Sequence, residues 1–144
     1  MKLSTRSRYG VRMMYELALA WKGEPVILKE IASRQEISEK YLSKLIIPLK
    51  GAGLIISTRG SHGGYTLARD PSGITLLEIV RVLEGDITPV LCLKDMDICS
   101  RSIDCAMRNI WAGLDRAISE YLKNITLDDI IKTTEGNDSS AYSI

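Results

Sequence analysis

The chain has 144 residues, of which 45% are hydrophobic, so it is long enough to bury a core and is not disordered by composition. Its N-terminus lacks the apolar run of a signal peptide, and no apolar stretch approaches the roughly 18 residues of a membrane span. These properties exclude secreted and membrane-embedded classes, and we expect a cytoplasmic protein.

Charge is distributed unevenly along the chain, although the net charge is only +1. Residues 1–72 carry 12 Lys and Arg against 6 Asp and Glu, whereas residues 73–144 carry 7 against 12. A basic first half suits contact with a polyanion such as nucleic acid. Chance variation in a solvated surface would give the same asymmetry, so the charge pattern alone does not decide between the two.

Three short helices are predicted at the start of the chain. Ser4, or its neighbour, caps the first helix, and the apolar spacing predicts a second helix over about 28–35. Ser38 caps the third helix, and we expect its last turn to be kinked at Pro48 because proline lacks a backbone donor.

A β-hairpin is predicted after the third helix. Residues 54–59 and 65–68 read as strands on either side of a glycine-rich turn. Three helices followed by a two-stranded hairpin predict a mainly α fold with a small β-hairpin, a winged helix-turn-helix DNA-binding domain over residues 1–72.

The second half of the chain is predicted to hold further helices around a loop. Thr75 and Glu78 form a capping-box signature for a connecting helix, so residues 73–103 comprise this helix and a cysteine-containing loop. A long helix from Asp104 and a short one ending near Lys132 are expected over 104–132, and the tail 133–144 is expected to be disordered. The long helix has one apolar stripe: Met107, Ile110, Trp111, Leu114, Ala117, Ile118, Tyr121 and Leu122.

The third predicted helix carries residues suited to reading DNA. With Tyr41 or Leu42 turned inward, Lys40, Ser43 and Lys44 face outward. The second helix of a helix-turn-helix enters the major groove, where lysine donates to guanine acceptors and serine donates or accepts. Ordinary solvated positions on a surface helix would show the same residue types.

The predicted hairpin turn strengthens the DNA-binding interpretation. Arg59 lies beside Gly60, Gly63 and Gly64, and a thin cationic turn suits close approach to the DNA backbone or minor groove. His62 is either a neutral loop residue or a phosphate contact.

Arginines near the chain start offer further phosphate contacts, at Arg6, Arg8 and Arg12. Such contacts give affinity and salt dependence but carry no sequence information. The sequence offers no nucleophile–base pair, phosphate loop or convergent carboxylates, so we do not expect an enzyme.

Three cysteines lie within 14 residues, Cys92, Cys99 and Cys105, in a C-x6-C-x5-C pattern. An odd number cannot pair completely within the chain, and the spacing lacks the short C-x2-C pairs of a zinc ribbon. Thiolates bind iron well, and an iron–sulfur cluster needs four ligands or three with a substitute. Redox-active thiols without a metal are the main alternative.

These features together resemble the family of bacterial winged-helix transcriptional regulators that includes IscR, NsrR, RirA and CymR. The resemblance extends to the iron–sulfur cluster regulator IscR, especially through residues 121–127. Besides the cysteines, the resemblance rests on residues 3–10, 37–42, 49–54, 59–65 and 125–130.

The resemblance implies a homodimer that is joined through the long C-terminal helix and binds a pseudo-palindromic double-stranded operator. It implies a repressor of genes for iron–sulfur cluster assembly, iron supply or stress response. It also implies a two-iron two-sulfur cluster on the three cysteines, whose state changes operator affinity or the choice of operator. We expect cluster ligation to order loop 92–105 and thereby to shift the two DNA-reading units relative to each other. A metal-free regulator, controlled by thiol oxidation or by a partner protein as CymR is, remains the alternative.

The candidate site residues follow from motif and resemblance. The candidate cluster ligands are Cys92, Cys99 and Cys105. The candidate DNA-binding residues are Arg6, Arg8, Ser38, Lys40, Tyr41, Ser43, Lys44, Arg59, Gly60 and His62.

Two positions depart from the family pattern. IscR-like members place a histidine ligand three residues after the last cysteine, where this chain has Arg108. The fourth ligand is therefore open among Asp97, Asp104, a serine, His62 and a group of the partner subunit. Ser43 stands where some relatives have glutamate, so operator preference is expected to differ.

Overall fold

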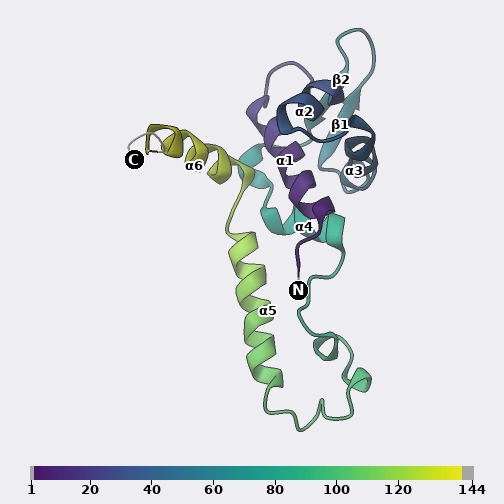
Figure 1. The fold of residues 1–144 in the computed structure, drawn as a ribbon, viewed down its shortest axis with the longest axis vertical. Coiled ribbons are helices and arrows are strands. Elements are labelled where there is room, and N and C mark those ends of the chain that lie inside the picture. Colours follow the sequence, from purple (N-terminus) through teal and green to yellow (C-terminus); the bar gives the residue numbers. More distant parts are fainter. Residues whose placement is uncertain (1, 141–144) are drawn as a thin grey trace.

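The computed structural model describes residues 2–140 and has the predicted mainly helical architecture with one small antiparallel hairpin (Figure 1). The helices and strands, in chain order, are α1 (Thr5–Leu19), α2 (Leu28–Gln35), α3 (Glu39–Gly51), β1 (Ile55–Thr58), β2 (Gly64–Leu67), α4 (Leu76–Glu84), α5 (Arg108–Lys123) and α6 (Leu127–Ser140). Elements α1 to β2 and α4 form a winged-helix head, residues 5–84. Within residues 2–140, no helix is both long and apolar enough to cross a bilayer.

The head is built around one apolar core. Helix spacing places one face of each helix inward, and these faces meet the inner side of the hairpin. Gly10 of α1 allows close packing on α4, because a Cβ at this position would overlap the side chain of Leu83. The principal buried side chains are Met13, Met14, Leu17, Ile31, Leu42, Leu45, Leu49, Leu54, Leu67, Ile79 and Leu83.

The hairpin is fastened to the segment that precedes α2. In its register Ile55 lies opposite Leu67 and Thr58 opposite Gly64. The backbones of Val26 and Tyr65 exchange two hydrogen bonds of 2.9 and 2.8 Å. A Cβ on Gly64 would lie 2.6 Å from the Val26 carbonyl oxygen, so the close approach of these two segments requires glycine.

The predicted helix starts in the head are confirmed. The Ser4 and Ser38 hydroxyls accept from backbone amides at the starts of α1 and α3, and Thr75 with Glu78 forms a complete capping box on α4. Helix α3 continues past Pro48 to Gly51, since a proline near a helix end removes only one hydrogen bond.

The C-terminal half differs from expectation at two helix ends. The long helix begins at Arg108 rather than Asp104, because residues 99–107 form successive turns, with hydrogen bonds from Ser102 N to Cys99 O and from Asp104 N to Arg101 O. Helix α6 extends through Ser140, past the expected end near Lys132. The Thr133 and Thr134 hydroxyls donate to carbonyls one turn earlier in this helix. Residues 141–144 lie outside the described part of the chain.

The two halves have different shapes. Helix α5 and the cysteine loop extend away from the head, while α6 returns to its side (Figure 1). Leu127 at the start of α6 is buried in the head core, and backbone hydrogen bonds join Leu76 to Ile125 and Leu127 to Ile74. The loop and α5 are therefore anchored to the head at both ends.

Candidate DNA-binding surface and cysteine loop

Helix α3 presents a polar face to solvent. Lys40, Ser43 and Lys44 are exposed, whereas Leu42 and Leu45 on the opposite side are buried. The Ser43 hydroxyl donates to the Lys40 carbonyl at 2.7 Å and keeps its lone pairs for a ligand. The three outward residues predicted from the sequence thus share one accessible face.

Two other predicted DNA-binding residues have structural contacts in this chain. The Ser38 hydroxyl accepts from the Tyr41 amide at 3.0 Å and so caps α3. The half-buried Tyr41 ring meets Tyr9 edge to face, with ring centroids 5.7 Å apart, and the Arg12 guanidinium lies over the Tyr9 ring. These contacts fix the start of α3 on α1, which positions the exposed lysines.

The hairpin turn projects beyond the head. Arg59, Gly60 and His62 are exposed, and Gly60 adopts a positive φ of 110° that favours glycine. The Lys50 ammonium of α3 donates to the Ser57 hydroxyl of β1 at 2.8 Å. The hydrogen bond joins the hairpin to α3, and it could not be predicted from the sequence because it depends on how the hairpin packs against α3.

The arginines of α1 divide into two groups. Arg6 and Arg8 are exposed on the first turns. Arg12 instead donates to the backbone carbonyl and the side-chain oxygen of Gln35, the latter at 2.8 Å. Arg12 therefore joins α1 to the end of α2, which is a different role from the phosphate contact expected from sequence.

A buried carboxylate missed by the sequence interpretation holds the same two helices together. Glu16 of α1 has a side chain only 7% exposed, and it accepts from Gln35 Nε2 at 2.6 Å and from Arg34 Nη1 at 3.4 Å. A buried charge needs such partners. The signal in the sequence was a glutamate among the apolar residues of an amphipathic helix.

The cysteine loop joins α4 to α5 through two short 3-10 turns, Leu91–Leu93 and Met96–Ile98. All three thiols are free; Cys92 and Cys105 are half-buried and Cys99 is exposed. Arg108 Nη1 donates to the Cys92 carbonyl at 2.6 Å. The residue at the position expected for a histidine ligand thus binds the backbone at the first cysteine.

The arrangement of this loop is not that of a formed cluster site. Thiolates are suitable donors for iron. However, within residues 2–140 no three histidine, cysteine or acidic side chains are grouped closely enough to hold a metal ion. Arg108 brings a cation and no lone pair to the expected ligand position. The residues as placed therefore do not fit an iron–sulfur cluster.

The start of the loop is held by a charged pair. Asp86 accepts from the backbone amide and hydroxyl of Thr88, and it forms an ion pair with Lys94. Hydrogen bonds from Lys94 and then from Thr88 lower the pKa of Asp86 to about 2. The carboxylate is therefore charged at neutral pH and pins the segment before Cys92.

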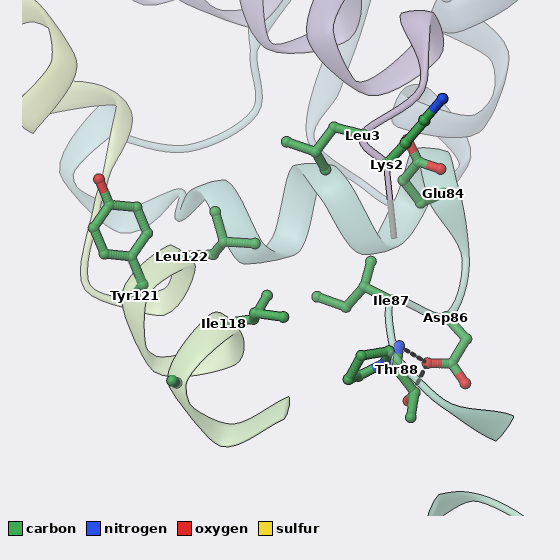
Figure 2. Close-up of a pocket in the computed structure, with 11 residues that line it drawn as sticks. Lys2, Leu3, Glu84, Asp86, Ile87, Thr88, Ile118, Tyr121 and Leu122 are labelled. Atoms are coloured by element: carbon green, nitrogen blue, oxygen red, sulfur yellow. Dashed lines mark hydrogen bonds between the residues drawn. The ribbon is translucent and has the colours of Figure 1, made fainter. Parts of the chain in front are cut away.

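Helix α5 carries its apolar stripe on the outside of the chain. None of its residues is buried; Ile110 is 56% exposed and Tyr121 is 70% exposed. A neighbouring groove has a volume of about 660 Å³. Leu3, Ile87 and Leu122 are among the residues that line it (Figure 2). Apolar surface therefore continues from α5 across the groove to the N-terminal segment.

Comparison with known proteins places these features in a family. The model of the Rrf2 family, described as an iron-dependent transcriptional regulator, matches residues 3–133. The transcriptional regulator CymR of Bacillus subtilis is 43% identical over 136 residues, covering 94% of each chain. The transcriptional regulator IscR of Vibrio campbellii is 36% identical over 135 residues, covering 94% of this chain and 80% of the relative.

Solved structures agree with the sequence relatives. The structure of CymR, the global cysteine regulator of B. subtilis, aligns with a TM-score of 0.80 at 41% identity, covering 92% of this chain and 98% of that one. T. potens IscR aligns with a TM-score of 0.78 at 39% identity, covering 95% and 90%. The chain therefore belongs to the Rrf2 family of winged-helix transcriptional regulators.

Proposed function

We propose that this chain is a homodimeric, sequence-specific regulator whose two heads bind the two halves of a pseudo-palindromic operator. The observation that carries the proposal is the exposed polar face of α3, Lys40, Ser43 and Lys44, on a rigid head with a cationic hairpin turn beside it. A helix presented in this way enters the major groove and reads base edges.

Each predicted contact has a separate task in this proposal. Lys40 and Lys44 donate to guanine acceptors, and the Ser43 hydroxyl, which donates its proton to the Lys40 carbonyl, accepts at a neighbouring base edge. Arg59 and Gly60 approach the backbone or minor groove with His62 at the turn, while Arg6 and Arg8 neutralise phosphates; these two candidate phosphate contacts set affinity without sequence preference. Ser38 and Tyr41 act by holding the start of α3.

The proposed dimer is joined through α5. Helix α5 has regular apolar spacing, yet none of its residues is buried. Ile118 and Leu122 pack partly against a cluster formed by Leu77, Val80 and Ile87. Ile110, Leu114 and Tyr121 are exposed and lack the packing that normally stabilises an amphipathic helix. A second copy placing its own α5 on this surface supplies that packing. The symmetric pairing then holds two heads at a fixed separation, as a palindromic operator requires.

We further propose that the cysteine loop sets operator affinity, because it connects the end of α4, at the edge of the head, to the start of α5. A change in the conformation of this loop changes how the heads are held relative to each other. Small changes in that separation alter the match to half-site spacing and hence the affinity.

An iron–sulfur cluster, two-iron two-sulfur in type, on Cys92, Cys99 and Cys105 is one proposed chemistry of this control. It is supported by the soft donor type of the thiolates and by kinship with IscR. Its proposed targets are genes of iron–sulfur cluster assembly. Because the thiols as placed do not form a ligand set, this form requires a rearranged loop.

Metal-free thiol control is the second proposed chemistry, and the hydrogen bond from Arg108 to the Cys92 carbonyl favours it. This contact orders the loop without a metal and occupies the side chain at the expected ligand position. A structure of Staphylococcus aureus CymR in an oxidized form is 35% identical, which supports oxidation as a form of control here.

Two measurements test the proposal. Selection of duplexes from random DNA by the full chain should yield a pseudo-palindromic site; recovery of no preferred sequence would contradict specific binding. Protein purified without oxygen should then be assayed for iron, sulfide and visible absorption. Absorption abolished by Cys92→Ala supports the cluster form. Iron-free protein whose operator affinity responds to oxidant supports the metal-free form.

A further inference from the structure

Ile47 is an apolar residue that lies outside the buried core of the head. It lies in the middle of α3 and is 72% exposed, whereas its neighbours Leu45, Ile46 and Leu49 are buried. The core of the head is complete without it. Its side chain is therefore available to a ligand of the α3 surface.

The position of Ile47 places it on the outward face of α3. Residues three, four and seven apart lie on one face of a helix, so Lys40, Ser43, Lys44 and Ile47 follow one another along a single surface. A groove between α3 and the hairpin is lined by Ser43 and Ile47, among others, and by Lys50, which is bonded to Ser57. Ile47 is thus an apolar group set among hydrogen-bond donors.

We propose that Ile47 determines operator specificity by contacting the C5 methyl group of a thymine in each half-site. The inference rests on the proposed binding of α3 in the major groove. Thymine is the only base that presents a methyl group there, and a branched aliphatic side chain with no donor or acceptor recognises it by apolar contact. An unmethylated base would leave the Ile47 side chain against water or a polar edge.

Helix geometry predicts where this thymine lies. Ile47 is seven residues beyond Lys40, which corresponds to about 10 Å along the helix axis at 1.5 Å per residue. Along B-DNA this distance spans about three base pairs at a rise of 3.4 Å. Because the groove runs obliquely to the duplex axis, the thymine read by Ile47 is therefore at most about three base pairs from the base read by Lys40.

Replacement of thymine by uracil tests the contact, because it removes only the methyl group. Each thymine of one half-site in a duplex selected by the full chain is replaced in turn, and affinity is measured for the unmodified chain and for Ile47→Ala. Loss of one buried methyl group should weaken binding about fourfold at one position. Ile47→Ala should bind the thymine and uracil duplexes equally, whereas Ile47→Val should still distinguish them.

Leu19→Ala is the matched control, since Leu19 is an aliphatic residue 52% exposed on α1. It should keep the full discrimination between thymine and uracil. Uracil duplexes that bind as tightly as thymine duplexes at every position would overturn the inference, as would discrimination that persists in Ile47→Ala. If the unmodified chain selects no sequence, the proposed function fails. If it selects a sequence but does not distinguish thymine from uracil, the inference on Ile47 fails and the proposed function stands.

Discussion

The head and α5 differ in the burial of their apolar side chains, although both show regular helical spacing. In the head, the apolar faces of α1 and α3 close on the hairpin and α4, and Leu42 is fully buried. In α5 the stripe from Met107 to Leu122 stays largely in solvent. The comparison teaches that the core of the head is closed within one chain, with Leu127 of α6 completing it, whereas the exposed part of the α5 stripe is the surface that the proposed dimer covers. Four predictions test this contrast.

The largest expected effect is on the stability of the head. Leu42→Ala leaves a cavity in a fully buried site and should lower the free energy of unfolding by about 2–5 kcal/mol. Leu114→Ala on α5, measured on dilute monomeric chain, should change it by less than about 0.5 kcal/mol. Denaturant unfolding checks both values, and equal losses would show that α5 is packed within its own chain.

The next effect concerns assembly. Trp111→Asp should abolish dimerisation, because it places a charge on the apolar stripe of α5. The head should stay folded, since Trp111 lies outside it, and α5 should remain helical because Asp near a helix N-terminus is compatible with the helix dipole. Loss of simultaneous binding by two heads should weaken operator binding about 10²-fold. Analytical ultracentrifugation with Glu120→Ala as the control measures this, and a Trp111→Asp variant that remains dimeric would refute the assignment of α5.

A smaller effect separates base reading from phosphate contact. Lys44→Ala should cost about 1–3 kcal/mol on the selected operator and relax preference at one position of each half-site. Arg6→Ala should instead weaken binding to all sequences and reduce the slope of log affinity against log salt concentration by about one. Equal loss on every duplex for Lys44→Ala would mean that another face of α3 enters the groove.

The smallest effect lies at the start of the cysteine loop. The folded pKa of Asp86 is lowered from 3.8 to about 2, so its stabilising contribution is present above pH 3.8 and is lost as the pH falls through about 2. Lys94→Ala should raise this pKa toward its ordinary value, as followed by an NMR titration of the Asp86 carboxyl. An unchanged titration would show that the ion pair does not hold the loop.

The sequence predicted the head more completely than the rest of the molecule. Caps at Ser4, Ser38 and Thr75 are local interactions, so their signatures can be found without a structure. The outward face of α3 followed from helical periodicity. The ties from Glu16 to Gln35 and from Lys50 to Ser57 join separate elements, and their partners depend on tertiary packing.

The cysteine loop was the least predictable region. The pattern of thiols gave the chemistry of the donors, but the spacing did not determine where each thiol lies. The hydrogen bond from Arg108 to the Cys92 carbonyl depends on the turns at 99–107. These turns were not predicted, because the apolar stripe of α5 favoured a helix over the end of this segment. The same stripe made the helix appear to begin four residues too early.

The most direct test of the account is the dependence of binding on half-site spacing. Two heads held at a fixed separation by α5 must face the same side of the duplex. Inserting about five base pairs between the half-sites, half a helical turn, should reduce affinity about 10²-fold, and inserting about ten should restore part of it. Affinity that does not depend on the inserted length would contradict a dimer that reads DNA with two rigidly coupled heads.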